Sequence, residues 1–128
     1  MIMKKKPIDI TGVWHFREDF GYGVDEGEMT IRQNGQKITG SMVYEERIEG
    51  DVPFVVCVDI EGFLIGEQVK FKAVGYELFD VEGDWEFNLE DRIGWIYDNE
   101  QIRGSSIDED GIEGQFIMRR KYAIKEQS

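Results

Sequence analysis

Cysteine, histidine and proline are scarce in this sequence of 128 residues: it has one cysteine, Cys57, one histidine, His15, and two prolines. A single cysteine excludes an internal disulfide and a cysteine-based structural zinc site. A serine–histidine–aspartate triad would have to use His15, which the strand pattern places on an outer face, so we expect no such triad. Because aromatic residues make up 12% of the chain and proline is rare, a disordered chain is not expected.

Long apolar runs and an excess of positive charge are also missing. No stretch is long enough to span a bilayer, and the basic segment Met1–Lys6 is not followed by the apolar core of a signal peptide. The chain has 27 acidic and 15 basic residues, and its net charge of -12 repels nucleic acid and anionic membranes. We therefore expect no nucleic-acid or membrane partner. We expect a cytoplasmic location, unless a leader has been removed.

Glycine, in contrast, recurs in a regular pattern. Read with a period of two, Ile10, Gly12, Trp14 and Phe16 share one face of a strand. The same isoleucine-x-glycine triplet returns at Ile38–Gly40, Ile48–Gly50, Ile60–Gly62, Ile102–Gly104 and Ile112–Gly114. A glycine on the apolar face lets a strand bend and the opposite wall approach, so the pattern predicts a small sheet that curls on itself.

The alternation predicts eight strands joined by hairpin-length connections, and no helix. The expected fold class is all-β, a single eight-stranded antiparallel up-and-down β-barrel over residues 10–122, with a lead-in of residues 1–9 and a polar tail of residues 123–128. Asn34–Gly35 is the strongest hairpin turn. Tight turns follow the second, fourth and sixth strands, and the longer loops at 21–27, 47–53 and 77–83 mark the expected mouth.

The sixth strand is the least regular. Its apolar residues predict an inward face made of Trp85, Phe87, Leu89, Ile93, Trp95 and Tyr97. That face crosses Asp91, so we expect either a bulge near Glu90–Arg92 or two short strands. In the last strand the expected inward residues are Ile112, Gly114, Phe116, Met118 and Arg120.

The opening Gly12-x-Trp14, the hairpin between Gly27 and Gly40 and the closing segment Gly114–Arg120 resemble the calycin group of barrels, which contains the lipocalin and avidin-like proteins. The resemblance implies that Trp14 packs against Arg120 at the closed end, with Gly12 as a structural glycine. The biotin-binding residues of avidin-like proteins do not carry over. Phe16 stands where those proteins place an asparagine, and Met42 stands where they place a tyrosine.

A calycin-like barrel implies a small, largely apolar ligand held inside it, and this is the leading hypothesis for function; no cofactor is predicted. The aromatic residues expected on the inner faces near the mouth are Phe20, Tyr44, Phe54, Trp85 and Phe87, with Ser106 as a polar anchor. Core packing is the competing interpretation of these residues. In that case the barrel is filled and acts as a protein-interaction or structural module.

A second alternative is an enzyme that uses interior carboxylates. Glu18, Glu46 and Asp91 share the parity of the core, although acids at such positions are more often solvated at a rim. No metal site is predicted. The acidic turn Asp108–Gly111 lacks the twelve-residue spacing and closing glutamate of a calcium loop.

The fourth and fifth strands are apolar on their expected outer faces as well. Val55 and Cys57 lie on one strand, with Phe63 and Ile65 further along it, and Val74 and Tyr76 lie on the other. An exposed apolar patch of this kind usually marks an interface, so the sequence predicts a homodimer built on these strands.

Overall fold

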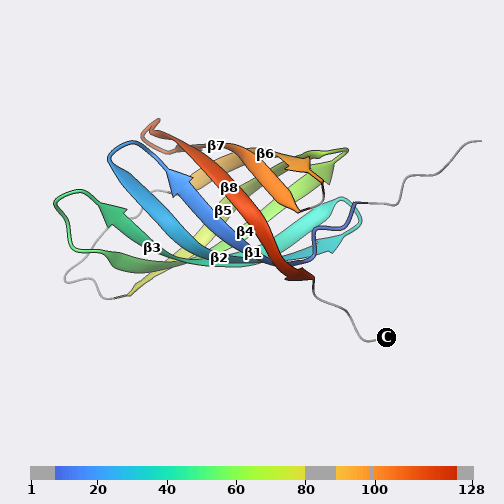
Figure 1. The fold of residues 1–128 in the computed structure, drawn as a ribbon, viewed down its shortest axis with the longest axis horizontal. Helices are drawn as coiled ribbons and strands as arrows, with labels where there is room; N and C mark the ends of the chain where they lie inside the picture. Colours follow the sequence, from blue (N-terminus) through green and yellow to red (C-terminus); the bar gives the residue numbers. More distant parts are fainter. Residues whose placement is uncertain (1–7, 80–88, 99, 124–128) are drawn as a thin grey trace, which may run out of the picture.

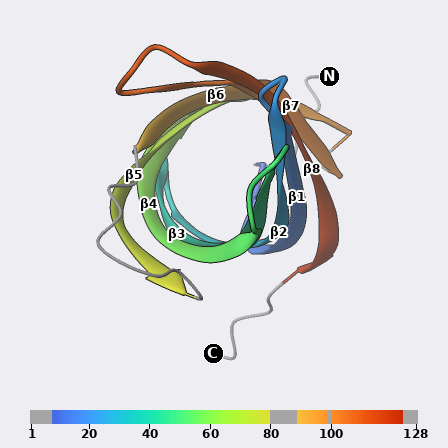
Figure 2. The same ribbon diagram turned by 90° about the vertical axis from the view of Figure 1, so that its left-hand side faces the viewer.

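The computed structural model describes residues 8–79, 89–98 and 100–123. They form one closed antiparallel barrel in which each strand pairs with its neighbours in the chain and the last strand pairs with the first. The strands are β1 (Gly12–Asp19), β2 (Gly23–Asn34), β3 (Lys37–Ile48), β4 (Phe54–Ile65), β5 (Gln68–Phe79), β6 (Glu90–Tyr97), β7 (Gln101–Asp108) and β8 (Glu113–Ala123). Figure 2 shows them arranged as a ring. The all-β, eight-stranded fold is confirmed.

The two ends of the barrel differ, as the loop lengths predict. In Figure 1 the β2–β3 and β4–β5 turns lie at one end of the long axis, where β1 begins, and the β1–β2, β3–β4 and β7–β8 connections lie at the other. We call the latter the open end. The described residues contain no helix that is long and apolar enough to cross a membrane.

Trp14 seals the closed end, and its predicted contact with Arg120 is confirmed. Trp14 is fully buried, and its indole Nε1 donates a hydrogen bond to the backbone oxygen of Ile10 at 3.0 Å. The Arg120 guanidinium lies 4.5 Å from the indole centroid and donates to the backbone oxygens of Thr11 and Asp9 at 3.0 and 2.9 Å. Arg119 is exposed, so the predicted register of the last strand is correct there. Ile112, expected to point inward, is instead 37% exposed, because it belongs to the connection before β8.

The second strand begins earlier than the sequence predicts. Its glycines favour a loop over residues 21–27, yet β2 starts at Gly23 and pairs with β3 over its whole length. Gly27 is a point of close approach between strands, because a Cβ atom there would lie 2.0 Å from the backbone oxygen of Val43. The added length of strand brings Asp25 onto the inner face, where it is fully buried.

The sixth strand has the opposite facing to the one its aromatic residues predict. Arg92 and Ile96 point inward and are buried, whereas Trp95 and Tyr97 are 50% and 47% exposed. Gly94 lies between the two inward residues, where a Cβ atom would lie 2.9 Å from Ile102 Cγ2. Arg92-x-Gly94 thus has the inward register of the isoleucine-x-glycine triplets, with arginine in place of isoleucine. Trp85 and Phe87 lie outside the described residues.

Packed side chains fill the part of the barrel interior that is nearer the closed end. The largest fully buried ones come from six strands or their flanks and include Ile10, Trp14, Phe16, Met29, Ile31, Ile38, Met42, Tyr44, Ile60, Ile102 and Met118. Phe16 is central to them, with its ring centroid 6.1 Å from that of Tyr44 and 6.0 Å from that of Phe116. An eight-stranded barrel is only just wide enough for side chains to fill, so this region is solid core.

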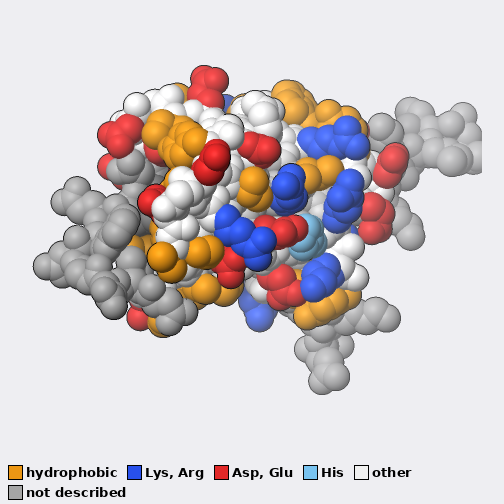
Figure 3. Space-filling model, turned by 60° about the vertical axis from the view of Figure 1, so that its left-hand side comes forward, with side chains coloured by type: hydrophobic (Ala, Val, Ile, Leu, Met, Phe, Trp, Pro, Cys, Tyr) orange, Lys and Arg blue, Asp and Glu red, His pale blue; other side chains and the backbone are white. Residues whose placement is uncertain are grey.

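The outer wall over β1, β2 and β8 carries charges of both signs. His15 contacts Glu26 at 3.1 Å, and Lys121 contacts Glu28. On the face drawn in Figure 3, lysine and arginine side chains alternate with acidic and hydrophobic ones. His15 is partly exposed and paired with a surface glutamate, as expected for an outward-facing residue.

Candidate functional site

Towards the open end, the inner face of the barrel changes from apolar to charged. Glu18 follows Phe16 on the inward side of β1, Asp25 precedes Met29 on β2, and Arg92 points inward from β6. All three are at most 3% exposed. Buried ionisable groups are rare in small domains unless they are paired or bind something, so this cluster is the candidate site.

Arg92 is held by two glutamates and by aromatic rings. Its Nε donates to Glu18 Oε2 at 2.9 Å, and its Nη2 donates to Glu18 Oε1 at 3.2 Å and to Glu90 Oε2 at 3.0 Å. The guanidinium carbon lies 5.1 Å from the ring centroid of Phe16 and 5.9 Å from that of Phe71. A two-point contact to Glu18 together with cation–π contacts gives the guanidinium a single well-defined position.

Glu18 and Glu90 share this arginine but differ in protonation. Burial raises the pKa of Glu18, yet the Arg92 charge and hydrogen bonds to the carboxylate outweigh it and hold the pKa below its usual value. Burial raises the pKa of Glu90 to about 8, because Arg92 offsets it only in part and Glu18 adds to it. At neutral pH the first carboxyl group is therefore ionised and the second is largely protonated.

Asp25 is the group in the cluster whose carboxyl oxygens have no partner among the described residues. Among the described residues neither of its carboxylate oxygens has a hydrogen-bond partner, and the side chain is fully buried. Burial, followed by the negative charges of Glu46, Glu90 and Glu18, raises the pKa of Asp25 to about 10. Burial also raises the pKa of Glu46, which is half-buried on β3 beside Asp25.

A small pocket opens above the cluster. Its volume is about 40 Å³, and it is lined by Glu18, Phe20, Tyr22, Glu46, Glu90, Ser106, Asp108, Ile112 and Gly114. Since a water molecule takes about 30 Å³ of liquid, this space holds little more than one water or a small ion. This pocket is too small to enclose an organic ligand of ordinary size.

The residues predicted to line a ligand cavity are only partly brought together. Phe20 and Ser106 border the pocket, and the Phe20 ring lies edge-on to Tyr22 with centroids 4.9 Å apart. Tyr44 is buried below the pocket, and Phe54 is half-buried against the core. The other two predicted lining residues are Trp85 and Phe87, outside the described part of the chain.

Of the three acidic residues predicted to face the interior, two do so. Glu18 and Glu46 point toward the pocket, whereas Asp91 is exposed because β6 has the opposite facing. Sequence reasoning missed Asp25, Glu90 and Arg92. The available signal was the spacing Asp25-x-Gly27 and Arg92-x-Gly94, which repeats the register of the triplets with a charged residue in the isoleucine position.

A larger groove of about 850 Å³ lies against the wall formed by β4 to β8. Most of its lining side chains belong to the outer face, including the exposed Phe63 and the lysines Lys70 and Lys72. Unlike the pocket at the open end, this groove has no unpartnered buried polar atom among the described residues.

Asp25→Asn is expected to stabilise the protein at pH 8 by at least about 1 kcal/mol, because asparagine is uncharged and folding no longer has to protonate a buried carboxylate. The pKa of Asp25 is about 10 in the folded state and about 3.9 in an unfolded chain, so folding takes up a proton between these values. Wild-type stability should therefore fall as pH rises through that window. Urea unfolding from pH 5 to pH 9 in metal-free buffer measures this.

Asparagine carries no charge, so the pH profile of the variant should be flatter than that of the wild type. Glu61→Gln, at an exposed position on β4, is the matched control and should leave the wild-type profile unchanged. Equal slopes for the wild type and Asp25→Asn would show that Asp25 is not a buried titrating group.

Comparison with known proteins supports the fold alone. No protein-family model matches the chain. No curated protein matches it either. A redesigned β-barrel, mFAP1, described as bound to DFHBI, has a TM-score of 0.62 and 10% identity, over 87% of this chain and 94% of its own. A de novo designed fluorescence-activating β-barrel has a TM-score of 0.57 and 14% identity, over 87% of this chain and 93% of its own.

Proposed function

We propose that this barrel binds a small molecule at its open end and that the molecule carries a positively charged group. The observation that carries the proposal is the charge balance of the site. Glu18, Asp25, Glu46 and Glu90 face a single buried cation, Arg92, among the described residues. Burial raises the pKa of Asp25 to about 10 and that of Glu90 to about 8, and a ligand that supplies positive charge would allow both groups to ionise and pair with it.

The position of the pocket limits how such a ligand would bind. Its charged group would enter between Glu46 and Glu90, with the Ser106 hydroxyl nearby. Its apolar part would rest on the rim, where Phe20, Tyr22 and Ile112 border the same pocket. The ligand expected from sequence is largely apolar; the structure favours one with an apolar body and a basic nitrogen.

The similarity in fold supports the proposal only in part. A designed barrel with the same fold is described as bound to the small molecule DFHBI, so a barrel of this shape accommodates a small molecule. The resemblance to calycins that the sequence suggests points to the same class of function.

The test is a comparison of small aromatic compounds that differ in charge. Benzylamine and tyramine are expected to shift the amide NMR signals of Phe20 and Ser106 at millimolar concentration. Benzyl alcohol and benzoate, which match benzylamine in size, should not. In the double variant Glu46→Gln and Glu90→Gln the response should fall at least tenfold, whereas Glu61→Gln should respond like the wild type. Equal responses to amine and benzoate would contradict the proposal.

A second candidate function is general acid–base catalysis at the same pocket. The observation that favours it is that the pKa values of Glu18 and Glu90 are shifted in opposite directions within one site. Such a pair supplies an ionised and a protonated carboxyl group together at neutral pH. Product formation from a bound compound, lost in Glu90→Gln, would distinguish catalysis from binding.

We also propose that the barrel forms a homodimer through β4 and β5. In this case the barrel acts as a structural module, and its filled interior supports the wall that forms the interface. Val74 is 45% exposed on β5, and Val55 and Cys57 are half-buried on the neighbouring strand. Tyr76, which the sequence also assigns to this wall, lies opposite the inward Val58, because the register shifts by one residue between Asp59 and Ile60. Apolar side chains in such numbers on one wall are typical of an interface. At the closed end of the same wall, Phe63 and Ile65 are also exposed.

Sedimentation velocity at 5–100 µM protein tests the dimer, which we expect in the micromolar range. The double variant Val55→Asp and Val74→Asp should be monomeric throughout, because it places charges in the interface. Ser41→Asp, on the exposed side of β3, is the control and should dimerise normally. A wild-type monomer at 100 µM would refute the interface.

A further inference from the structure

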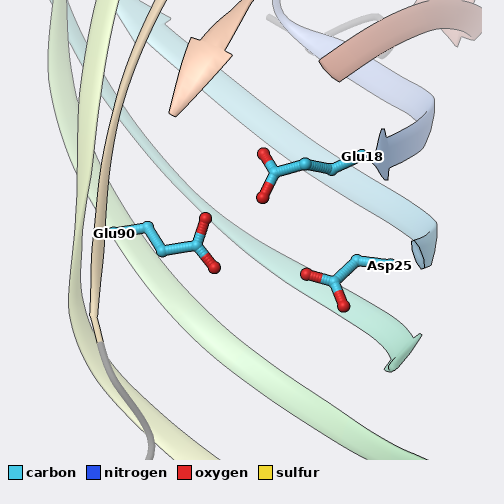
Figure 4. Close-up of side chains that lie close together, drawn as sticks. All are labelled: Glu18, Asp25 and Glu90. Atoms are coloured by element: carbon cyan, nitrogen blue, oxygen red, sulfur yellow. The ribbon is translucent and has the colours of Figure 1, made fainter. Parts of the chain in front are cut away.

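Three carboxyl groups from three different strands converge beneath the pocket. They are Glu18 on β1, Asp25 on β2 and Glu90 on β6, and each offers an oxygen within 4.8 Å of the oxygens of the other two. Figure 4 shows their side chains pointing toward a common space inside the barrel. Oxygens on opposite sides of a calcium ion are about 4.8 Å apart, because each lies about 2.4 Å from the ion, so oxygens within that separation of one another are close enough to share one cation.

Asp25 supplies an independent indication of a ligand. Its side chain is fully buried, it points into this space, and neither oxygen has a hydrogen-bond partner among the described residues. Buried carboxylates almost always accept hydrogen bonds or bind a cation. Arg92 does not fill this role, because its guanidinium donates to Glu18, to Glu90 and to the sulfur of Met42.

The donor set favours one class of ion. All three candidate ligands are carboxylates, and the adjoining pocket adds the Ser106 hydroxyl and room for about one water molecule. The single histidine lies on the outer wall with Glu26, and Cys57 alternates with the inward Val56 and Val58 on β4. Oxygen-only sites suit calcium, magnesium and manganese rather than zinc or copper.

We propose that Glu18, Asp25 and Glu90 form a binding site for one hard divalent cation inside the open end of the barrel. Arg92 would remain bound to the two glutamates and orient their carboxylates toward the ion. The pocket above would provide the route of entry and the position of a bound water. This inference goes beyond the small-molecule proposal and does not depend on it, since the ion would lie below the pocket rim.

The experiment uses the full chain after treatment with a chelator, at pH 8 in 0.15 M KCl to suppress weak binding to the acidic surface. Free Mn²⁺ is followed by electron paramagnetic resonance during a titration from 5 µM to 2 mM. We expect saturable binding of one Mn²⁺ per chain, with displacement by Ca²⁺ or Mg²⁺. Binding to Asp25→Asn should be at least tenfold weaker.

Asp25→Asn keeps the volume of the side chain, and cooperative thermal unfolding would establish that the variant is folded. Glu90→Gln is the second test variant and should also weaken binding at least tenfold. Two controls should bind like the wild type: Asp91→Asn, next to the site but exposed, and Asp110→Asn in the acidic turn.

Three results would overturn the proposal. They are absence of saturable binding, equal binding in folded Asp25→Asn, and loss of binding in Asp110→Asn alone, which would place the ion at the acidic turn. The amine titrations described above are run in chelator. Failure of the metal site and failure of the small-molecule site therefore give separate results.

Discussion

Arg92→Met is expected to destabilise the barrel by about 3–5 kcal/mol, the usual cost of removing one partner from a buried ion pair. Methionine fills a similar volume but leaves the ionised Glu18 buried without its two-point contact, which spans 74 residues of sequence. It also removes the cation that lies against Phe16 and Phe71. Chemical denaturation at pH 7 measures the loss.

Two further variants separate the charge effect from lost packing. Adding Glu18→Gln to Arg92→Met should recover a large part of the stability, because no unpaired charge then remains. Arg103→Met removes an arginine 5.4 Å from the ring of Tyr97 on the outer wall and should cost no more than about 1 kcal/mol. If Arg92→Met and Arg103→Met lower the free energy of unfolding equally, the buried ion pair contributes no more to stability than a surface contact does.

Trp14→Ala is expected to destabilise the barrel by about 3–5 kcal/mol, as other large-to-small changes in protein cores do. Trp14 is fully buried, donates a hydrogen bond to Ile10 and supports the guanidinium of Arg120. Alanine removes all three interactions and leaves a cavity at the closed end. Denaturant unfolding of the variant measures the effect.

The neighbouring residue provides the control. His15→Ala changes a partly exposed side chain whose contact is a surface pair with Glu26, so its effect should stay within about 0.5 kcal/mol. Equal losses for Trp14→Ala and His15→Ala would mean that the facing of β1 is wrong.

Reading the strands with a period of two identifies the inward-facing residues correctly where those residues are apolar. It places Trp14 and Arg120 together, although 106 residues separate them, because both lie on the inner faces of strands that a closed barrel must pair. The same reading fails on β6, where it assigns Trp95 and Tyr97 to the core. Hydrophobicity alone favours a tryptophan over an arginine for a core position. Arg92 can be buried because it pairs with Glu18 on β1, which is far away in the sequence.

The candidate site is predicted only in part for a related reason. Glu18 and Glu46 continue an inward parity that apolar neighbours establish, so their positions can be inferred. Asp25 follows two glycines and precedes a third, and that local composition predicts a loop. Only the pairing of β2 with β3 shows that Gly27 permits close packing and that Asp25 lies inside.

Native mass spectrometry of protein purified from its own host tests the central claim, that the carboxylates at the open end form a binding site for a positively charged ligand. We predict a mass above that of the polypeptide, from a divalent cation, a basic small molecule or both, which is lost on denaturation and reduced in Asp25→Asn. A wild-type mass equal to that of the bare chain, unchanged in Asp25→Asn, would contradict the claim.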